Sequence, residues 1–180
     1  MKENVIIVNC NVPSEAFQIL SKLRQDFDND SFEILHAAVV KKEAGQLSVE
    51  DGFISGNSVE GHGLTGGLIG ALVGVLGGPL GVLLGAGVGE LIGDSMDANK
   101  VENNTELLEK ASECLTDGET ALMLLVKEDD ETALPSMLKD FQISITRMGA
   151  KEIEAEIEQA EKQKAKEEEI RKAAAARTEG

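Results

Sequence analysis

Residues 61–94, GHGLTGGLIGALVGVLGGPLGVLLGAGVGELIGD, contain two series of glycines with a spacing of four residues. The first series is Gly66, Gly70, Gly74 and Gly78, and the second is Gly81, Gly85, Gly89 and Gly93. This spacing places each series on one face of a helix, with leucines on the remaining faces. The pattern is typical of a glycine zipper, and it predicts that these eight glycines form the oligomerisation surface.

The two series are separated by Gly77, Gly78 and Pro79. Proline lacks the N–H that a helix interior needs and clashes with the carbonyl four residues earlier, and glycines favour the end of a helix. One straight helix is therefore disfavoured. The sequence predicts a helical hairpin with arms at about 64–76 and 80–93 and with its turn at these three residues.

The eleven glycines from Gly66 to Gly93 each disfavour a helix by roughly 0.8–1 kcal/mol relative to alanine. Close packing must offset this cost, either between protomers, in a bilayer, or against the chain's own domain. Each arm is roughly 20 Å long, less than the roughly 30 Å of a hydrocarbon core. The flanks contain no Lys or Arg between Lys42 and Lys100, and the chain has no Trp or Tyr. These features disfavour a spanning arm but leave all three environments open.

The 180-residue chain has a net charge of −16, which argues against nucleic acid and against anionic lipid as partners. Its two cysteines, Cys10 and Cys114, lack the spacing of a metal site and are expected to be free thiols. The first apolar run is too short for a signal peptide. We therefore expect no metal or cofactor, and a location in the cytoplasm or on the cytoplasmic side of the inner membrane.

Two wholly apolar stretches, residues 5–8 and 121–126, predict strands that are covered on both faces. Further strands are expected at 32–41, 46–50 and 143–148, with a turn at Ala44 and Gly45 between the first two. Helices are expected from Pro13, with an inward stripe of Ala16, Phe17, Leu20, Leu23 and Phe27, and at 105–115 and 129–141. If the two apolar strands are central and parallel, the fold is α+β with a ferredoxin-like split βαβ sheet.

The chain is thereby divided into four parts. Residues 1–60 and 95–148 form the two halves of the ferredoxin-like domain, residues 61–94 are the inserted hairpin, and residues 149–180 form a charged C-terminal helix. In that helix Ala150, Ile153, Ile157 and Ala160 make a short apolar seam, while the rest is dense in opposite charges. A protein partner for this helix is expected to contact only its first three turns.

The order VIIV, a helix, FEILHAAVV, QLSVEDG, the block LTGGLIGALVGVLGGPLGVLLGAGVGELIGD and the strand TALMLLV resembles the bacterial domain-of-unknown-function family twelve sixty-nine. The resemblance covers roughly residues 4–148, and the charged tail after Met148 is longer than the family core. It implies a ferredoxin-like domain with a glycine-rich hairpin insertion. Members of this family are labelled as membrane proteins, and the resemblance implies no particular activity.

Residues 61–66, GHGLTG, match the pattern of a dinucleotide-binding loop, but an acidic loop precedes them where a buried strand is required. We therefore expect a non-enzymatic protein that self-assembles into a membrane-associated or closed homo-oligomer, with its hairpins packed between protomers. The alternative is a soluble, dimeric ferredoxin-like module that regulates or binds a small ligand.

Overall fold

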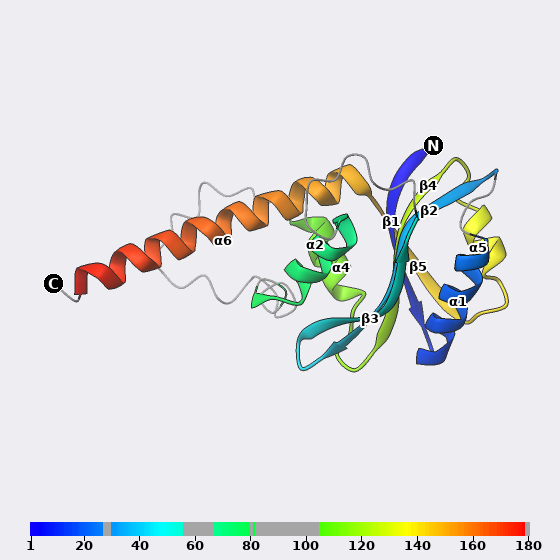
Figure 1. Cartoon of the computed structure of the whole chain (residues 1–180), viewed down its shortest axis with the longest axis horizontal. Helices are drawn as coiled ribbons and strands as arrows, with labels where there is room; N and C mark the ends of the chain where they lie inside the picture. Colours follow the sequence, from blue (N-terminus) through cyan, green and yellow to red (C-terminus); the bar gives the residue numbers. More distant parts are fainter. Residues whose placement is uncertain (27–29, 56–66, 80, 82–104, 179–180) are drawn as a thin grey trace.

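Five strands form one antiparallel sheet within residues 1–26, 30–55, 67–79, 81 and 105–178, which the computed structural model describes (Figure 1). The order of the strands across the sheet is β3-β2-β4-β1-β5. Their bounds are β1 Lys2–Cys10, β2 Phe32–Glu43, β3 Gln46–Ile54, β4 Thr120–Glu128 and β5 Ile143–Gly149. The expected α+β class and the long C-terminal helix are confirmed.

The two apolar stretches lie in β1 and β4, which are adjacent strands of the interior of the sheet. Alternate residues of β1 pack on opposite faces: Val5 and Ile7 on one side, Ile6 and Val8 on the other. The expectation that these two stretches run parallel is wrong, because β1 pairs antiparallel with β4, with Val5 opposite Leu125. Apolar content predicts burial on both faces of a sheet, but it carries no information about strand direction.

The helices form a layer on each face of the sheet (Figure 1). One face packs against α1 (Pro13–Gln25) and α5 (Ala133–Met137), and we call it the α1/α5 face. The other packs against α2 (Gly67–Leu76), α4 (Glu106–Glu113) and the start of α6 (Ala150–Thr178), and we call it the α2/α4/α6 face. The sheet is thus the middle layer of three.

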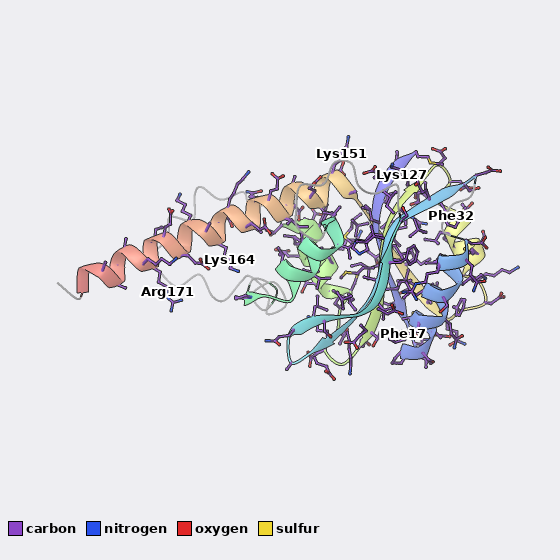
Figure 2. All side chains as sticks on the ribbon, viewed as in Figure 1. Phe17, Phe32, Lys127, Lys151, Lys164 and Arg171 are labelled. Atoms are coloured by element: carbon purple, nitrogen blue, oxygen red, sulfur yellow. The ribbon has the colours of Figure 1, made fainter. Side chains whose placement is uncertain are left out.

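Two helices differ in detail from the sequence prediction. In α1 the buried stripe includes Ile19, whereas Phe17 is 39% exposed (Figure 2); Phe27 lies outside the described residues. The helix expected at 129–141 is only five residues long. Before it, the Asp130 carboxylate accepts a hydrogen bond from the Thr132 N–H at 2.8 Å, which forms a turn in place of the first helical turn.

The β2–β3 hairpin turns at Ala44 and Gly45, as predicted. Both residues have positive φ, 52° and 75°, which is the backbone twist that a two-residue hairpin turn requires. Strand β3 continues to Ile54, four residues beyond its expected end, because residues 51–54 still pair with β2. The Arg24 guanidinium of α1 fastens this extension by donating hydrogen bonds to Asp51 and to the Gly52 carbonyl, at 2.6 and 2.8 Å.

The apolar seam of α6 is buried in the chain's own core. Ala150, Ile153, Ile157 and Ala160 are at most 4% exposed and pack with α2, α4 and the sheet. The position of the seam was predicted, but its partner was not, because the sequence suggested a separate protein. Beyond residue 160 the helix extends away from the sheet (Figure 1).

Candidate functional site

Helix α2 is the described part of the expected first arm of the hairpin, and its large side chains are buried against the chain's own sheet. Leu68, Ile69, Leu72 and Leu76 are at most 2% exposed and belong to the α2/α4/α6 face. The helix ends at Leu76, the residue at which we expected the first arm to end. The leucine side of this arm therefore packs against the chain's own domain, which is one of the three environments that the sequence left open.

The glycine side of α2 points away from the sheet. A Cβ placed on Gly70 or on Gly74 would meet no described atom within 4 Å. These glycines border a groove of about 310 Å³ between α2 and α6. Its described lining is Gly70, Ala71, Gly74, Val75, Gly78, Pro79, Glu161 and Lys164. A helix that approached along this groove could come close to the α2 backbone.

Gly77 has the opposite environment. A Cβ on this residue would lie 3.0 Å from the backbone nitrogen of Leu47 in β3 and 2.9 Å from the carbonyl oxygen of Val73. The Gly77 N–H donates to that same carbonyl at 2.8 Å, which closes the last turn of α2. Gly77 thus lets the end of α2 lie directly on β3.

The two environments predict opposite effects of one added methyl group. Gly74→Ala should raise the free energy of unfolding of the unassembled chain by about 0.8–1 kcal/mol, because alanine favours a helix and no described atom lies within 4 Å of the added methyl group. Gly77→Ala should lower it by about 1–3 kcal/mol, because the methyl group would crowd backbone atoms. Urea denaturation of the two variants checks both signs. A loss of stability in Gly74→Ala would show that the glycine side of α2 is already filled.

Of the eight glycines that we expected to form the oligomerisation surface, the structure describes four. It brings Gly70, Gly74 and Gly78 to one groove. Gly81 follows the turn, and its N–H donates to the Gly78 carbonyl at 3.0 Å. Gly66, Gly85, Gly89 and Gly93 lie outside the described residues, as does most of the second arm.

The polar wall of the groove comes from Glu161 and Lys164 of α6, which the sequence did not single out. Helix α6 is also fastened to α4 by a carboxylate, Glu156, which is 4% exposed. It accepts hydrogen bonds from the N–H groups of Leu107 and Leu108, at 3.0 and 2.9 Å. These donors are free at the start of any helix, so Glu156 caps α4 from a distant position in the chain. In the sequence, the one sign that Glu156 would be buried is its position beside Ile153 and Ile157 of the apolar seam.

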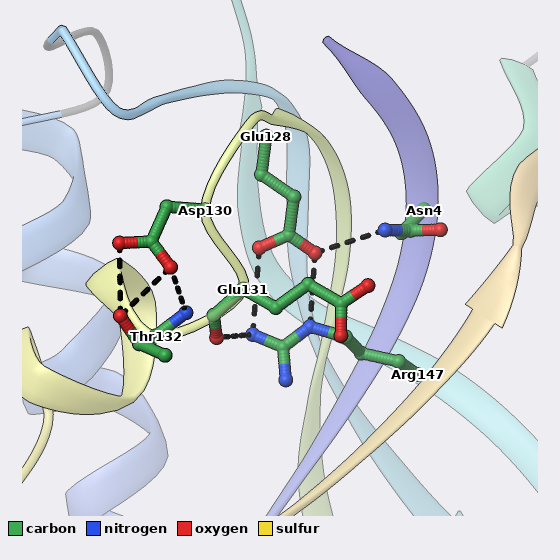
Figure 3. Close-up of polar contacts among 6 residues, drawn as sticks. All are labelled: Asn4, Glu128, Asp130, Glu131, Thr132 and Arg147. Carbon is green, nitrogen blue, oxygen red and sulfur yellow. Dashed lines mark hydrogen bonds and ion pairs between the residues drawn. The ribbon is translucent and has the colours of Figure 1, made fainter.

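A second polar cluster joins β1, β4 and β5 at one end of the sheet (Figure 3). The Glu128 carboxylate, whose side chain is 1% exposed, accepts hydrogen bonds from Arg147 Nε and Asn4 Nδ2, both at 2.9 Å. Arg147 also donates to the Glu131 carbonyl at 2.7 Å. Because Glu128 of β4 accepts hydrogen bonds from β1 and from β5, the strand beyond β1, this cluster has the features of a structural anchor.

A scan of protein families matches residues 63–172 to the family described as "Protein of unknown function (DUF1269)". The chain belongs to this family. No curated protein and no solved structure matched it.

The DUF1269 match corrects the extent that the sequence suggested. It begins at residue 63 and includes most of α6, up to residue 172. The charged helix was expected to lie outside the family core, yet most of it lies within the match. The matched segment thus includes both walls of the α2–α6 groove.

Among the described residues of this DUF1269 protein, the remaining cysteine and histidine side chains are Cys10, Cys114 and His36. Cys10 packs on the α1/α5 face and Cys114 on the opposite face, and both are free thiols. Burial, with a smaller effect of the Glu15 charge, raises the pKa of Cys10 to about 11, so it stays protonated at neutral pH. Burial lowers the pKa of His36, which is therefore neutral at pH 7. Among the described residues, no group of three His, Cys, Asp or Glu side chains is arranged to bind a metal.

None of the described helices is both long enough and apolar enough to cross a membrane.

Proposed function

We propose that this DUF1269 protein is a non-enzymatic self-assembling protein, in which glycine-zipper hairpins pack between protomers to form a membrane-associated or closed homo-oligomer. The observation that carries the proposal is the open glycine side of α2, where a Cβ added to Gly70 or Gly74 would have no described neighbour within 4 Å. Glycine destabilises a helix, so a glycine face needs a close partner to offset its cost.

The spacing of the glycines supports a helical partner. Measured from the Pro79–Leu80 peptide bond, Gly74 and Gly70 lie as far before it as Gly85 and Gly89 lie after it. If an antiparallel partner helix carried the second glycine series, its glycines would lie opposite the glycines of α2. We propose that copies of the chain supply such partners to each other, across the groove beside α6.

The burial of the leucine side supports contact between proteins over contact with lipid for this arm. Leu68, Leu72 and Leu76 fill the core against the sheet, so they are not available to acyl chains while the domain is folded. In the described part of this arm, the glycine side and the groove remain accessible, and a groove lined by backbone favours another helix.

We also infer that the domain is ferredoxin-like. Strands β1 and β2 are joined by α1, and each pairs antiparallel with β4, which lies between them. They therefore run parallel to each other as a split βαβ unit. Strand β3 then extends the usual four-stranded arrangement at one edge.

The test is to fill the glycine side with bulk. Gly70→Leu/Gly74→Leu should abolish assembly above the smallest stable unit, because two leucines would hold a partner helix away. The measurement is molar mass by light scattering on the full chain, with circular dichroism to show that the sheet is retained. Gln18→Leu adds the same side chain to an exposed position of α1 and should assemble like the wild type.

The outcomes separate the possible roles of this surface. An unchanged molar mass in the double variant would show that assembly, if any, uses another surface. Loss of the folded sheet would show that the glycine side is packed within one chain. Fractionation without detergent then distinguishes the two forms of assembly, since a closed particle stays soluble, whereas a membrane-associated one sediments with membranes and resists a high-salt wash.

A further inference from the structure

The second half of α6 offers a surface that the glycine zipper does not use. Residues 164–166 and 168–176 are all exposed, and Ile170 is 58% exposed. This half extends beyond the other helices (Figure 1), and Figure 2 shows Lys164 and Arg171 on the same side of it, the side on which α2 lies. A long exposed helix with a regular pattern of side chains along one face is a common element of protein interfaces.

The charge of this half differs from that of the rest of the protein. Residues 161–178 contain six basic and four acidic residues, so their net charge is +2, whereas all other residues together carry −18. Two acidic bodies repel each other at long range. A contact between copies through the mixed-charge end of α6 would keep those bodies apart.

The charges on one face of α6 alternate in sign. Glu161, Lys164, Glu168 and Arg171 follow each other at steps of three, four and three residues, which places them along one stripe. All four are exposed. In a parallel pair of helices in register, each side chain would meet its own copy and therefore a like charge. In an antiparallel pair centred at residue 166, Glu161 meets Arg171 and Lys164 meets Glu168, each twice by symmetry.

We propose that two copies of the chain join through an antiparallel contact between the second halves of their α6 helices, with Glu161 of each copy paired with Arg171 of the other. This interface is separate from the glycine side of α2, although it begins beside it. Glu161 and Lys164 form the α6 wall of the α2–α6 groove, so the α6 contact adjoins the glycine side without occupying it.

Pairs within one helix are the competing explanation of the charge pattern. Lys164 and Glu168 are four residues apart and can pair in the same helix. Glu161 and Arg171 are ten residues apart, about 15 Å along the axis, so they cannot contact each other within one copy. A dependence of association on this second pair is therefore evidence for contact between copies.

The experiment is a charge-reversal cycle on the full chain. Glu161→Arg and Arg171→Glu should each raise the concentration at half-association about tenfold, because each reversal creates two repulsive pairs in the symmetric contact. The double variant Glu161→Arg/Arg171→Glu restores opposite charges and should return to within about twofold of the wild type. Analytical ultracentrifugation over a concentration series measures these values, and helix content by circular dichroism verifies that α6 remains formed.

The matched control is Lys162→Glu, on the opposite side of the same helix, which should associate like the wild type. Association that stays weak in the double variant, or that is unaffected by either single reversal, would overturn the proposal. Failure here is distinguishable from failure of the glycine zipper, because Gly70→Leu/Gly74→Leu leaves the α6 charges intact. If that double variant still forms a dimer that responds to the charge cycle, the α6 contact stands by itself.

Discussion

Arg147→Ala lowers the free energy of unfolding by about 3–5 kcal/mol, which is the larger of the two main effects that we expect. The substitution leaves the Glu128 carboxylate, 1% exposed, with Asn4 as its only remaining partner in the cluster. A buried charge without its counter-ion costs much more than the pair itself contributes. Urea denaturation monitored by circular dichroism measures the loss.

A second variant separates the stranded charge from the loss of packing. Glu128→Gln/Arg147→Ala should recover more than half of the lost stability, because a buried amide is less costly than a buried carboxylate. The amide oxygen also remains able to accept the hydrogen bond from Asn4. If the double variant is as unstable as Arg147→Ala, the packing of the arginine side chain is responsible, and the ion pair is not.

Ile157→Ala lowers the free energy of unfolding by about 2–5 kcal/mol, because it opens a cavity where α6 packs on α2, α4 and the sheet. Ile157 is fully buried, whereas Ile170 on the same helix is 58% exposed. Ile170→Ala is therefore the matched control, and its effect should stay within about 0.5 kcal/mol. Equal effects of the two substitutions would contradict the packing of the first turns of α6 into the core.

Local sequence patterns predicted which helices and strands form better than they predicted how these elements are arranged beside one another. The four apolar residues of β1, the turn at Ala44 and Gly45, and the seam of α6 all follow from spacing and side-chain type. The antiparallel direction of β1 and β4 did not, because both arrangements bury the same side chains. The length of α5 was missed because the Asp130 turn competes with the helix at a position where helix formers are also present.

The groove was half predicted, for a similar reason. The spacing of four separates Gly70 and Gly74 from the leucines, and the structure places the two kinds of residue on different sides of α2. Nothing in that spacing says that the leucines cover the chain's own sheet, or that Glu161 and Lys164 form the facing wall. The Glu156 cap and the Glu128–Arg147 pair join residues 48 and 19 positions apart, respectively, and such contacts become visible only when the elements are assembled.

The position of β1 in the sheet has a consequence for how the protein is made. Its two neighbours are β4 and β5, so Val5 lies opposite Leu125 and Met148. The strand is synthesised before both neighbours, and more than a hundred residues must follow it before either of them exists. Contacts between such distant residues slow folding. An unpaired apolar strand can associate with other chains. The apolar residues of β1 are thus exposed to association with other chains during translation, until β4 and β5 have been made.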